Sequence, residues 1–407
     1  MNTQPIAVTG LGMVTPAGMG TAATWEHMRT GVPTAVSDPE LTGLAVDFSC
    51  RVRDLDARRR LGGRLCMRLD RFGQMAVIAA REAVAHASLG STDWDAARVG
   101  VVLGVGANSL STYPVEFGRL RDGRTDKVSP FALPRSVPNM VAGAVSLDLG
   151  AKGPSFTTSS ACASGTTALA VACDLLRGGA CDIVISGGSE SANSVMCSVT
   201  FGQMQALSKR RHDPAGASRP FDADRDGFVL GEGAGILVLE RAGHARARGA
   251  RALAHLAGHA SSCDAYHYTS PDPEGNGLAQ AVRSALADAV LAPRDIGHVN
   301  AHGTSTELND QTEARALHQV FGPPPPVTAN KSVIGHSMGA AGAIEAALTV
   351  LTLQHQLIPP TANLDRMDPL IDLDVVTKLP RPARIDAALT VSSGFGGQNA
   401  ALVLTRA

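Results

Sequence analysis

The chain has 407 residues, which is too long for one average core, so we expect two domains or two fused halves. A composition of 44% hydrophobic and 18% charged residues is typical of a soluble globular protein, and a formal net charge of −1 argues against nucleic-acid binding. The start of the chain lacks the features of a secretory signal, and no apolar run reaches membrane length, so we expect no membrane association. Seven cysteines without a Cys-x-x-Cys pair disfavour a disulfide framework and a zinc site, and they suit a reducing cytoplasm.

The predicted elements begin with a buried strand at residues 5–16 that runs into a glycine turn. Gly10 and Gly12 in this turn suggest a dinucleotide-binding motif, but Thr15 replaces the third glycine, so a cofactor there is improbable. Residues 58–71 then concentrate arginine in a nearly neutral chain. Such a run is usually a solvated face, and the alternative is a docking surface for an acidic partner.

Residues 154–188 predict a strand, a corner of small residues, a helix and a second strand. Cys162 stands at the corner, where unpaired N–H groups and the positive end of the helix dipole favour a thiolate. This is the strand–nucleophile–helix arrangement of a hydrolase elbow, with sulfur in place of oxygen. The elbow alone leaves a second interpretation open, because a free cysteine is most often a buried packing residue.

The alternation of strands and helices continues to the end of the chain and predicts a layered α/β protein. A glycine turn feeds an apolar strand up to residue 240, and we place the boundary between two halves, 1–250 and 251–407, after the charged stretch that follows. The second half predicts strands near residues 299, 327 and 400–404, and helices at 278–290, 310–321 and 338–354.

Reactive side chains recur in three glycine-rich stretches of the second half, at residues 300–306, 330–345 and 392–399. Two of these stretches contain a histidine, His302 and His336. One histidine alone would be read as a hydrogen-bonded core residue. Two histidines in such loops, together with a cysteine elbow elsewhere, favour a catalytic site.

Glu345 gives independent support for this site. It lies in a helix otherwise made of alanine and aliphatic residues, so its carboxylate is expected to be buried and to need a partner. Lys331, just before that helix, is the obvious candidate. A buried Lys–Glu pair beside two histidines would fix their orientation and protonation.

These motifs resemble those of the elongating β-ketoacyl–acyl carrier protein synthases, condensing enzymes of the thiolase fold. The resemblance runs almost end to end, and within the family it is closest to the second-type fatty acid enzyme and its relatives in type II polyketide assembly. It implies a five-layer αβαβα sandwich of two similar α/β halves. Its most specific parts are Ala161-Cys-Ala-Ser-Gly165, residues 221–235, Asn300-Ala-His-Gly-Thr-Ser-Thr306 and residues 331–342.

The resemblance implies a Cys-His-His site that works in two stages. Cys162 would take an acyl chain from a carrier-protein thioester, while the backbone N–H groups of Cys162 and Phe395 hold the developing oxyanion. His302 and His336 would then bind the thioester carbonyl of the malonyl group and stabilise the enolate left by loss of carbon dioxide. The enolate carbon attacks the acyl-cysteine, and the product is a 3-oxoacyl chain two carbons longer.

The same resemblance assigns the residues around this site. Lys331, paired with Glu345, would support the histidines, and no metal or redox cofactor enters the chemistry. The residues implied in substrate binding are Thr304 and Thr306 at the phosphopantetheine arm, Phe201 and Phe395 at a gate, and Ala107 and Ala132 at the acyl pocket. Two alanines at those last positions predict a roomier pocket than in the ordinary fatty acid enzyme, with Ala132 contributed by the dimer partner.

The expected partners are an acyl carrier protein and a second subunit. The carrier protein, typically acidic, would dock on Arg64, Arg68, Lys209, Arg210 and Arg211. The second subunit would be either an identical chain or a homologue that lacks the cysteine and sets chain length. Fatty acid and polyketide elongation both remain open.

Three rival functions fit less well. A thiolase acting on CoA esters needs a second cysteine near its C-terminal glycine loop, and no cysteine follows Cys263. A starter-unit synthase would carry Asn at the position of His336. A non-catalytic chain-length partner subunit would lack the nucleophile, so Cys162 argues against that scaffolding role.

Overall fold

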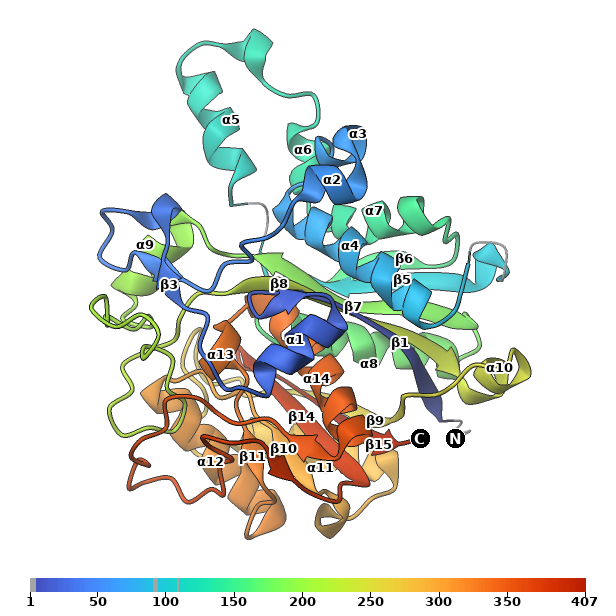
Figure 1. Ribbon diagram of the computed structural model, residues 1–407, viewed down its shortest axis with the longest axis vertical. Helices are drawn as coiled ribbons and strands as arrows, with labels where there is room; N and C mark the ends of the chain where they lie inside the picture. The colour runs from blue at the N-terminus through green and yellow to red at the C-terminus, as the bar shows by residue number, and fades with distance from the viewer. Residues whose placement is uncertain (1–4, 91–93, 108–109) are drawn as a thin grey trace.

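The computed structural model describes residues 5–90, 94–107 and 110–407 (Figure 1). Five main strands come from the first part of the chain and lie in the order β6-β5-β7-β8-β1. β5 runs parallel to β6 and β7, whereas β8 is antiparallel to β7 and β1. Their bounds are β1 (Ile6–Thr15), β5 (Val99–Gly104), β6 (Ser155–Thr158), β7 (Ile183–Ser191) and β8 (Glu232–Arg241).

Five strands from the rest of the chain repeat this arrangement, in the order β11-β10-β14-β15-β9. Numbered along the chain within its own set, each group has the order 3-2-4-5-1, so the two halves share one topology. β1 and β9 pair antiparallel over three residue pairs, from Ile6↔Leu256 to Val8↔Ala254, and join the two sets into one hydrogen-bonded path. The second set consists of β9 (Ala254–Cys263), β10 (His298–Asn300), β11 (Val327–Thr328), β14 (Ala387–Gly394) and β15 (Gln398–Arg406).

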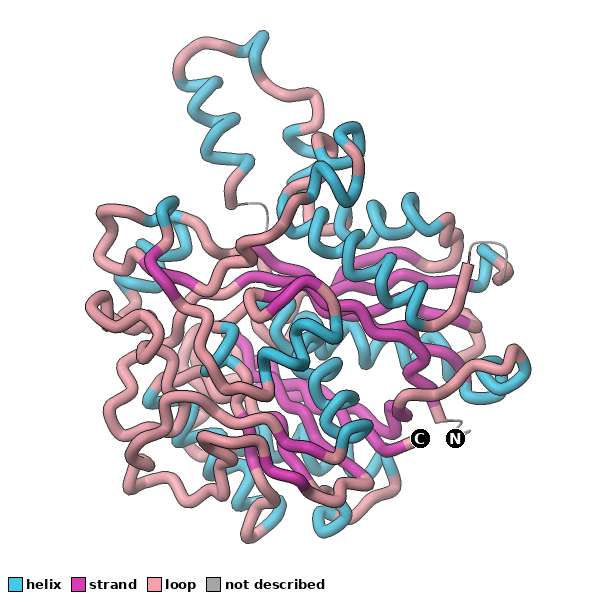
Figure 2. The backbone as a smooth tube through the Cα atoms, viewed as in Figure 1, coloured by secondary structure: helices cyan, strands magenta, loops and turns pink. Residues whose placement is uncertain are grey.

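Helices complete the predicted five-layer thiolase-like fold (Figures 1 and 2). α4 (Arg71–His86) and α7 (Met140–Leu149) cover the outer face of the first set, and their apolar residues share one core with alternate strand residues. α11 (Asn276–Ala289) and α12 (Glu307–Phe321) cover the outer face of the second set. α8 (Ser164–Arg177) and α14 (Ala341–His355) lie between the two sets and form the central layer.

The two central helices approach each other at backbone distance. A Cβ atom at Gly165 would lie 2.9 Å from the backbone nitrogen of Ala343, and one at Gly342 would overlap the Thr166 hydroxyl. Every residue of α14 from Ala341 to Leu353 is buried, as expected for a helix enclosed by two sheets and a second helix. The small residues of both helices therefore allow the close packing of this layer.

Shorter elements surround these layers, and α5 extends away from the body at the top of Figure 1. Among the described residues, no helix is long and apolar enough to cross a membrane. The shorter strands are β2 (Gly18–Met19), β3 (Val36–Ser37), β4 (Phe48–Ser49), β12 (Leu357–Ile358) and β13 (Arg381–Pro382). The shorter helices are α1 (Thr21–Met28), α2 (Ala57–Leu61), α3 (Gly63–Cys66), α5 (Thr112–Arg121), α6 (Ala132–Ser136), α9 (Val195–Gln203), α10 (Ala242–Ala247) and α13 (Lys331–Ile334).

Candidate active site

The strand, corner and helix predicted around Cys162 are confirmed. β6 ends at Thr158, Ala161 adopts a left-handed φ of 50°, and α8 begins at Ser164. The Ser164 side chain holds the corner together, since its Oγ donates to the Ala161 carbonyl at 2.6 Å and accepts the N–H of Ser160 at 3.0 Å. Such strain in a non-glycine residue persists only where the surrounding structure enforces it.

A cavity of about 510 Å³ opens at this corner and gathers most of the predicted site residues. Lys331 and Glu345 lie behind the cavity wall, each 1% exposed, and Ala132 is not among the lining residues of its own chain. The predicted residues that line the cavity are Cys162, His302, His336, Thr304, Thr306, Phe201, Phe395 and Ala107.

The Cys162 side chain is partly buried at the wall of the cavity. Burial raises the pKa of Cys162 to about 11, and the Lys331 charge and the Phe395 backbone N–H lower it only in part. Loss of solvent therefore opposes the thiolate that the Lys331 charge and the backbone N–H favour. Cys173 and Cys181 are fully buried, as expected of packing residues.

The two histidines meet edge to face at the cavity, with ring centroids 5.3 Å apart and planes at 87°. Burial and then the Lys331 charge hold the pKa of both His302 and His336 well below 6.5, so the imidazoles are neutral at pH 7. Lys331 Nζ lies 3.3 Å from His302 Nδ1. Because an ammonium only donates, Nδ1 must accept, and the His302 proton resides on Nε2.

Two buried carboxylates hold this arrangement from behind. Glu345 pairs with Lys331, which also donates to the His302 carbonyl at 2.6 Å. Glu313 of α12 accepts the backbone N–H groups of His302 at 2.6 Å and Gly303 at 2.8 Å. Glu313 was missed from the sequence; the only available signal was an acidic residue on the apolar face of a predicted helix.

The turn between β14 and β15 packs directly on the nucleophile. A Cβ atom at Gly394 would lie 2.8 Å from the Ser160 carbonyl and 3.0 Å from the Cys162 nitrogen, so only glycine permits this approach. The next residue, Phe395, directs its backbone N–H at the Cys162 sulfur. This N–H is therefore suitably placed to stabilise negative charge beside Cys162.

A chain of aromatic rings runs from the histidines to this turn. Phe395 contacts Phe201 at a centroid distance of 6.2 Å, and Phe201 contacts Phe228 at 5.5 Å. Phe228 lies 5.4 Å from the His336 ring, with the planes at 81°. The sequence predicted Phe201 and Phe395 as neighbours but not the link through Phe228.

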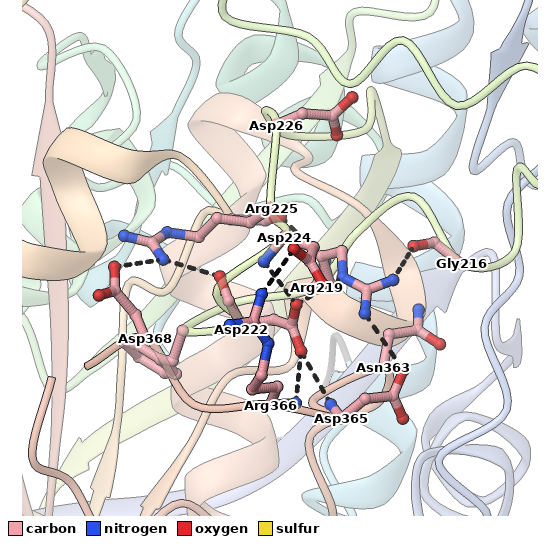
Figure 3. A network of polar contacts seen from close by, with 12 residues as sticks. Gly216, Arg219, Asp222, Asp224, Arg225, Asp226, Asn363, Asp365, Arg366 and Asp368 are labelled. Carbon is pink, nitrogen blue, oxygen red and sulfur yellow. Dashed lines mark hydrogen bonds and ion pairs between the residues drawn. The ribbon is translucent and has the colours of Figure 1, made fainter. Parts of the chain in front are cut away.

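The rim of the cavity that carries Thr304 and Thr306 is held by a buried arginine, Arg225, whose contacts with Asp222 and Asp368 are drawn in Figure 3. The two threonine hydroxyls lie 2.9 Å apart, and the Arg225 guanidinium donates to the Thr306 and Glu307 carbonyls. Arg225 also pairs with Asp368 at 2.8 Å, within a network that includes Asp222 and Arg219. This network fixes the position of the rim.

The basic residues predicted to dock a carrier protein differ in their surroundings. Arg64 and Arg68 are exposed, and the Arg68 guanidinium lies 5.6 Å from the centre of the Phe131 ring. Arg211 is already paired with Asp47 at 2.5 Å, and Arg210 donates to the Asp224 carbonyl at 2.6 Å. Among these five residues, and within the part of the chain that the structure describes, the positive charge without a carboxylate partner therefore lies mainly on Arg64 and Arg68, with exposed Lys209 in addition.

Fold and site together define a thiolase-like condensing enzyme, an acyltransferase. Residues 3–245 match the model of the β-ketoacyl synthase N-terminal domain, and residues 253–365 match that of the C-terminal domain. The chain therefore belongs to the β-ketoacyl synthase family.

Three relatives place it more closely. It is 40% identical to 3-oxoacyl-[acyl-carrier-protein] synthase 2 of Synechocystis sp., over 98% of each chain. The ishigamide ketosynthase/chain length factor structure aligns over 100% of each chain, with a TM-score of 0.93 and 33% identity. A type II polyketide ketosynthase solved with its acyl-carrier protein and a bound hexaketide also aligns over 100% of each chain, with a TM-score of 0.91 and 31% identity.

Proposed function

We propose that this enzyme transfers an acyl chain from an acyl carrier protein to Cys162 and extends it by two carbons from a malonyl thioester on the same kind of carrier. The observation that supports this most is the convergence of a thiol, two neutral histidines and a backbone N–H on one cavity.

In the first stage the Cys162 sulfur attacks the acyl thioester, with the Phe395 N–H beside the developing oxyanion. The acyl–sulfur bond of the carrier breaks as the bond to Cys162 forms. The thiol proton leaves with the carrier thiol.

In the second stage the two imidazoles donate N–H groups to the malonyl thioester oxygen. His302 is prepared for this by Lys331, which leaves the proton on Nε2. The carbon–carboxylate bond breaks, carbon dioxide leaves, and the donors stabilise the enolate charge. The enolate carbon then bonds to the acyl carbon, and the Cys162 sulfur leaves and regains a proton.

The partners follow from the surface. We infer that a second subunit, identical or a homologue without the cysteine, covers the outer edge of β6. This strand ends the hydrogen-bonded path, and Phe156 on it and Leu147 on α7 are 38% and 81% exposed. Ala132 would then act in the partner's pocket, and Ala107 in its own.

The solved ketosynthase/chain length factor relative favours a polyketide role with an unlike partner. Seven free cysteines suit a cytoplasmic enzyme.

Mass spectrometry of the intact protein tests the nucleophile. Incubation with a short acyl thioester of an acyl carrier protein should add one acyl group to the wild type and none to Cys162→Ala. Cys197→Ala is the matched control, because Cys197 lines the same cavity and should leave the adduct unchanged. An adduct that persists in Cys162→Ala contradicts the proposal.

The same preparations test the roles of the histidines. His302→Ala and His336→Ala should slow malonyl decarboxylation more than acylation of Cys162, because their main task is the enolate charge. Release of carbon dioxide from malonyl-carrier protein and formation of the adduct are measured separately. Equal loss of both steps would contradict the two-stage assignment.

A further inference from the structure

Glu190 is a buried carboxylate that the reaction described above does not use. It lies near the end of β7 and is 2% exposed. Its Oε2 accepts the backbone N–H of Gly106 at 2.7 Å and that of Ala107 at 3.0 Å. These two residues form the turn after β5 and line the acyl cavity.

A second turn of the cavity wall meets the same carboxylate. Gly339 packs against Glu190, because a Cβ atom there would lie 3.0 Å from Oε2 and 2.2 Å from the Gly106 nitrogen. The preceding residue, Met338, lines the cavity with a left-handed φ of 46°. Glu190 therefore joins two turns that are more than 200 residues apart in the chain.

The charge of Glu190 is held by backbone N–H groups, and among the described residues no lysine or arginine pairs with it. Burial raises the pKa of Glu190 to about 7, and the N–H groups of Gly106, Ala107 and Gly339 oppose that shift. Hydrogen bonds to a charged acceptor are among the stronger ones, so the ionised form of Glu190, which these N–H groups favour, is well suited to fix both turns.

Building on the proposed function, we propose that Glu190 is a positioning residue that sets the acyl-chain selectivity of this enzyme by fixing the cavity wall at Ala107 and Met338. A chain long enough to pass Ala107 and Met338 would lie along this wall, and a shorter chain would touch less of it. Loss of the anchor therefore lets the wall move and weakens binding of long chains selectively. Neither histidine contacts Glu190, so decarboxylation should not change.

The test compares long and short acyl-carrier proteins as substrates of Glu190→Gln and Glu190→Asp. Gln keeps the shape but removes the charge, and Asp keeps the charge but does not reach both N–H groups. Either variant should raise the long-chain KM about tenfold relative to the short-chain KM, the effect of one misfitted methylene-sized contact. The Glu190 charge also raises the pKa of Cys162, so kcat is compared between chain lengths within each variant. If Glu190→Gln does not fold, Glu190→Asp alone tests the proposal.

Ser189→Ala is the matched control. Ser189 is the buried neighbour of Glu190 on β7, but its hydroxyl donates to the Phe72 carbonyl on the opposite face of the strand. This variant should keep the long-to-short ratio of the wild type. A ratio unchanged in folded Glu190 variants, or one changed equally in Ser189→Ala, overturns the proposal. Failure of the proposed function is distinguishable, because the wild type would then form no short-chain adduct on Cys162.

Discussion

His298 is a buried histidine whose ring nitrogens make no hydrogen bond among the described residues. It lies on β10 with no exposed surface. Burial lowers the pKa of His298 to about 3. In the unfolded chain its pKa returns to about 6.5. Below pH 6.5 the unfolded state therefore binds a proton that the folded state refuses, and stability falls as the pH falls.

We expect His298→Leu to reduce this acid sensitivity. Between pH 7 and pH 5 the wild-type residue should cost about 2 kcal/mol of unfolding free energy that the variant does not lose. Urea unfolding at the two pH values measures the difference, and the raised carboxyl pKa values elsewhere cancel because both proteins share them. Exposed His212→Asn is the control and should behave as wild type. Equal pH slopes for His298→Leu and the wild type would contradict the prediction.

At the residue scale the sequence predicts reactive groups better than the groups that hold them. Cys162 and His302 stand in glycine-rich motifs whose chemistry is local, and both line the cavity. Glu190 and Glu313 act on backbone N–H groups of other segments, and no local pattern reports such contacts. The pKa of Cys162 also depends on burial, which only the folded chain defines.

Among the elements, α3 and the segment after it present the clearest docking charge. Arg68 is exposed and unpaired by carboxylates among the described residues, whereas Arg211 is paired with Asp47. The two basic runs that looked equivalent in the sequence are therefore different surfaces. A charge already compensated by a neighbour attracts an acidic partner less.

Replacing single arginines by glutamine should distinguish the Arg68 surface from the Arg211 surface. Arg68→Gln should raise KM for carrier-bound substrate several-fold at low salt and flatten its salt dependence, and Arg211→Gln should do so less. Exposed Arg251→Gln, in the loop before β9, is the control and should leave KM unchanged. Steady-state kinetics at low and high ionic strength measure the effect. Equal changes of KM in all three variants would contradict a docking role for Arg68.

The order of elements was predictable, but their pairing was not. The helices near α8, α12 and α14 follow from apolar periodicity and glycine stops. The repeated 3-2-4-5-1 order depends on contacts between strands far apart in the chain, and β10 and β11 have only three and two residues. Such short strands carry no local signal of register.

At the scale of the whole molecule, one edge strand of the sheet, β6, has no further strand paired with it among the described residues. β6 ends the path of strands, and Phe156 is 38% exposed on it. An open edge with apolar side chains binds other strands readily. We therefore expect assembly through this edge.

Phe156→Asp should lower the mass of the assembly in solution, because a charge beside the edge opposes strand pairing. Light scattering after gel filtration measures the mass at micromolar concentration. Val290→Asp is the control, since Val290 is 79% exposed at the end of α11 and adopts a left-handed φ that Asp tolerates. An unchanged mass for Phe156→Asp, when a multimer is present in the wild type, would contradict assembly at this edge.

The close contact of α8 with α14 has a mechanical consequence. Cys162 belongs to one half and His302 to the other, and the backbones at Gly165 and Ala343 touch between them. Two halves joined in this way cannot move apart without breaking the close packing of the central helix layer. Substrate must instead enter along the cavity, past the Phe395 ring at its mouth. The depth of the cavity then limits the length of substrate that the protein accepts, because the two halves do not move apart to admit more.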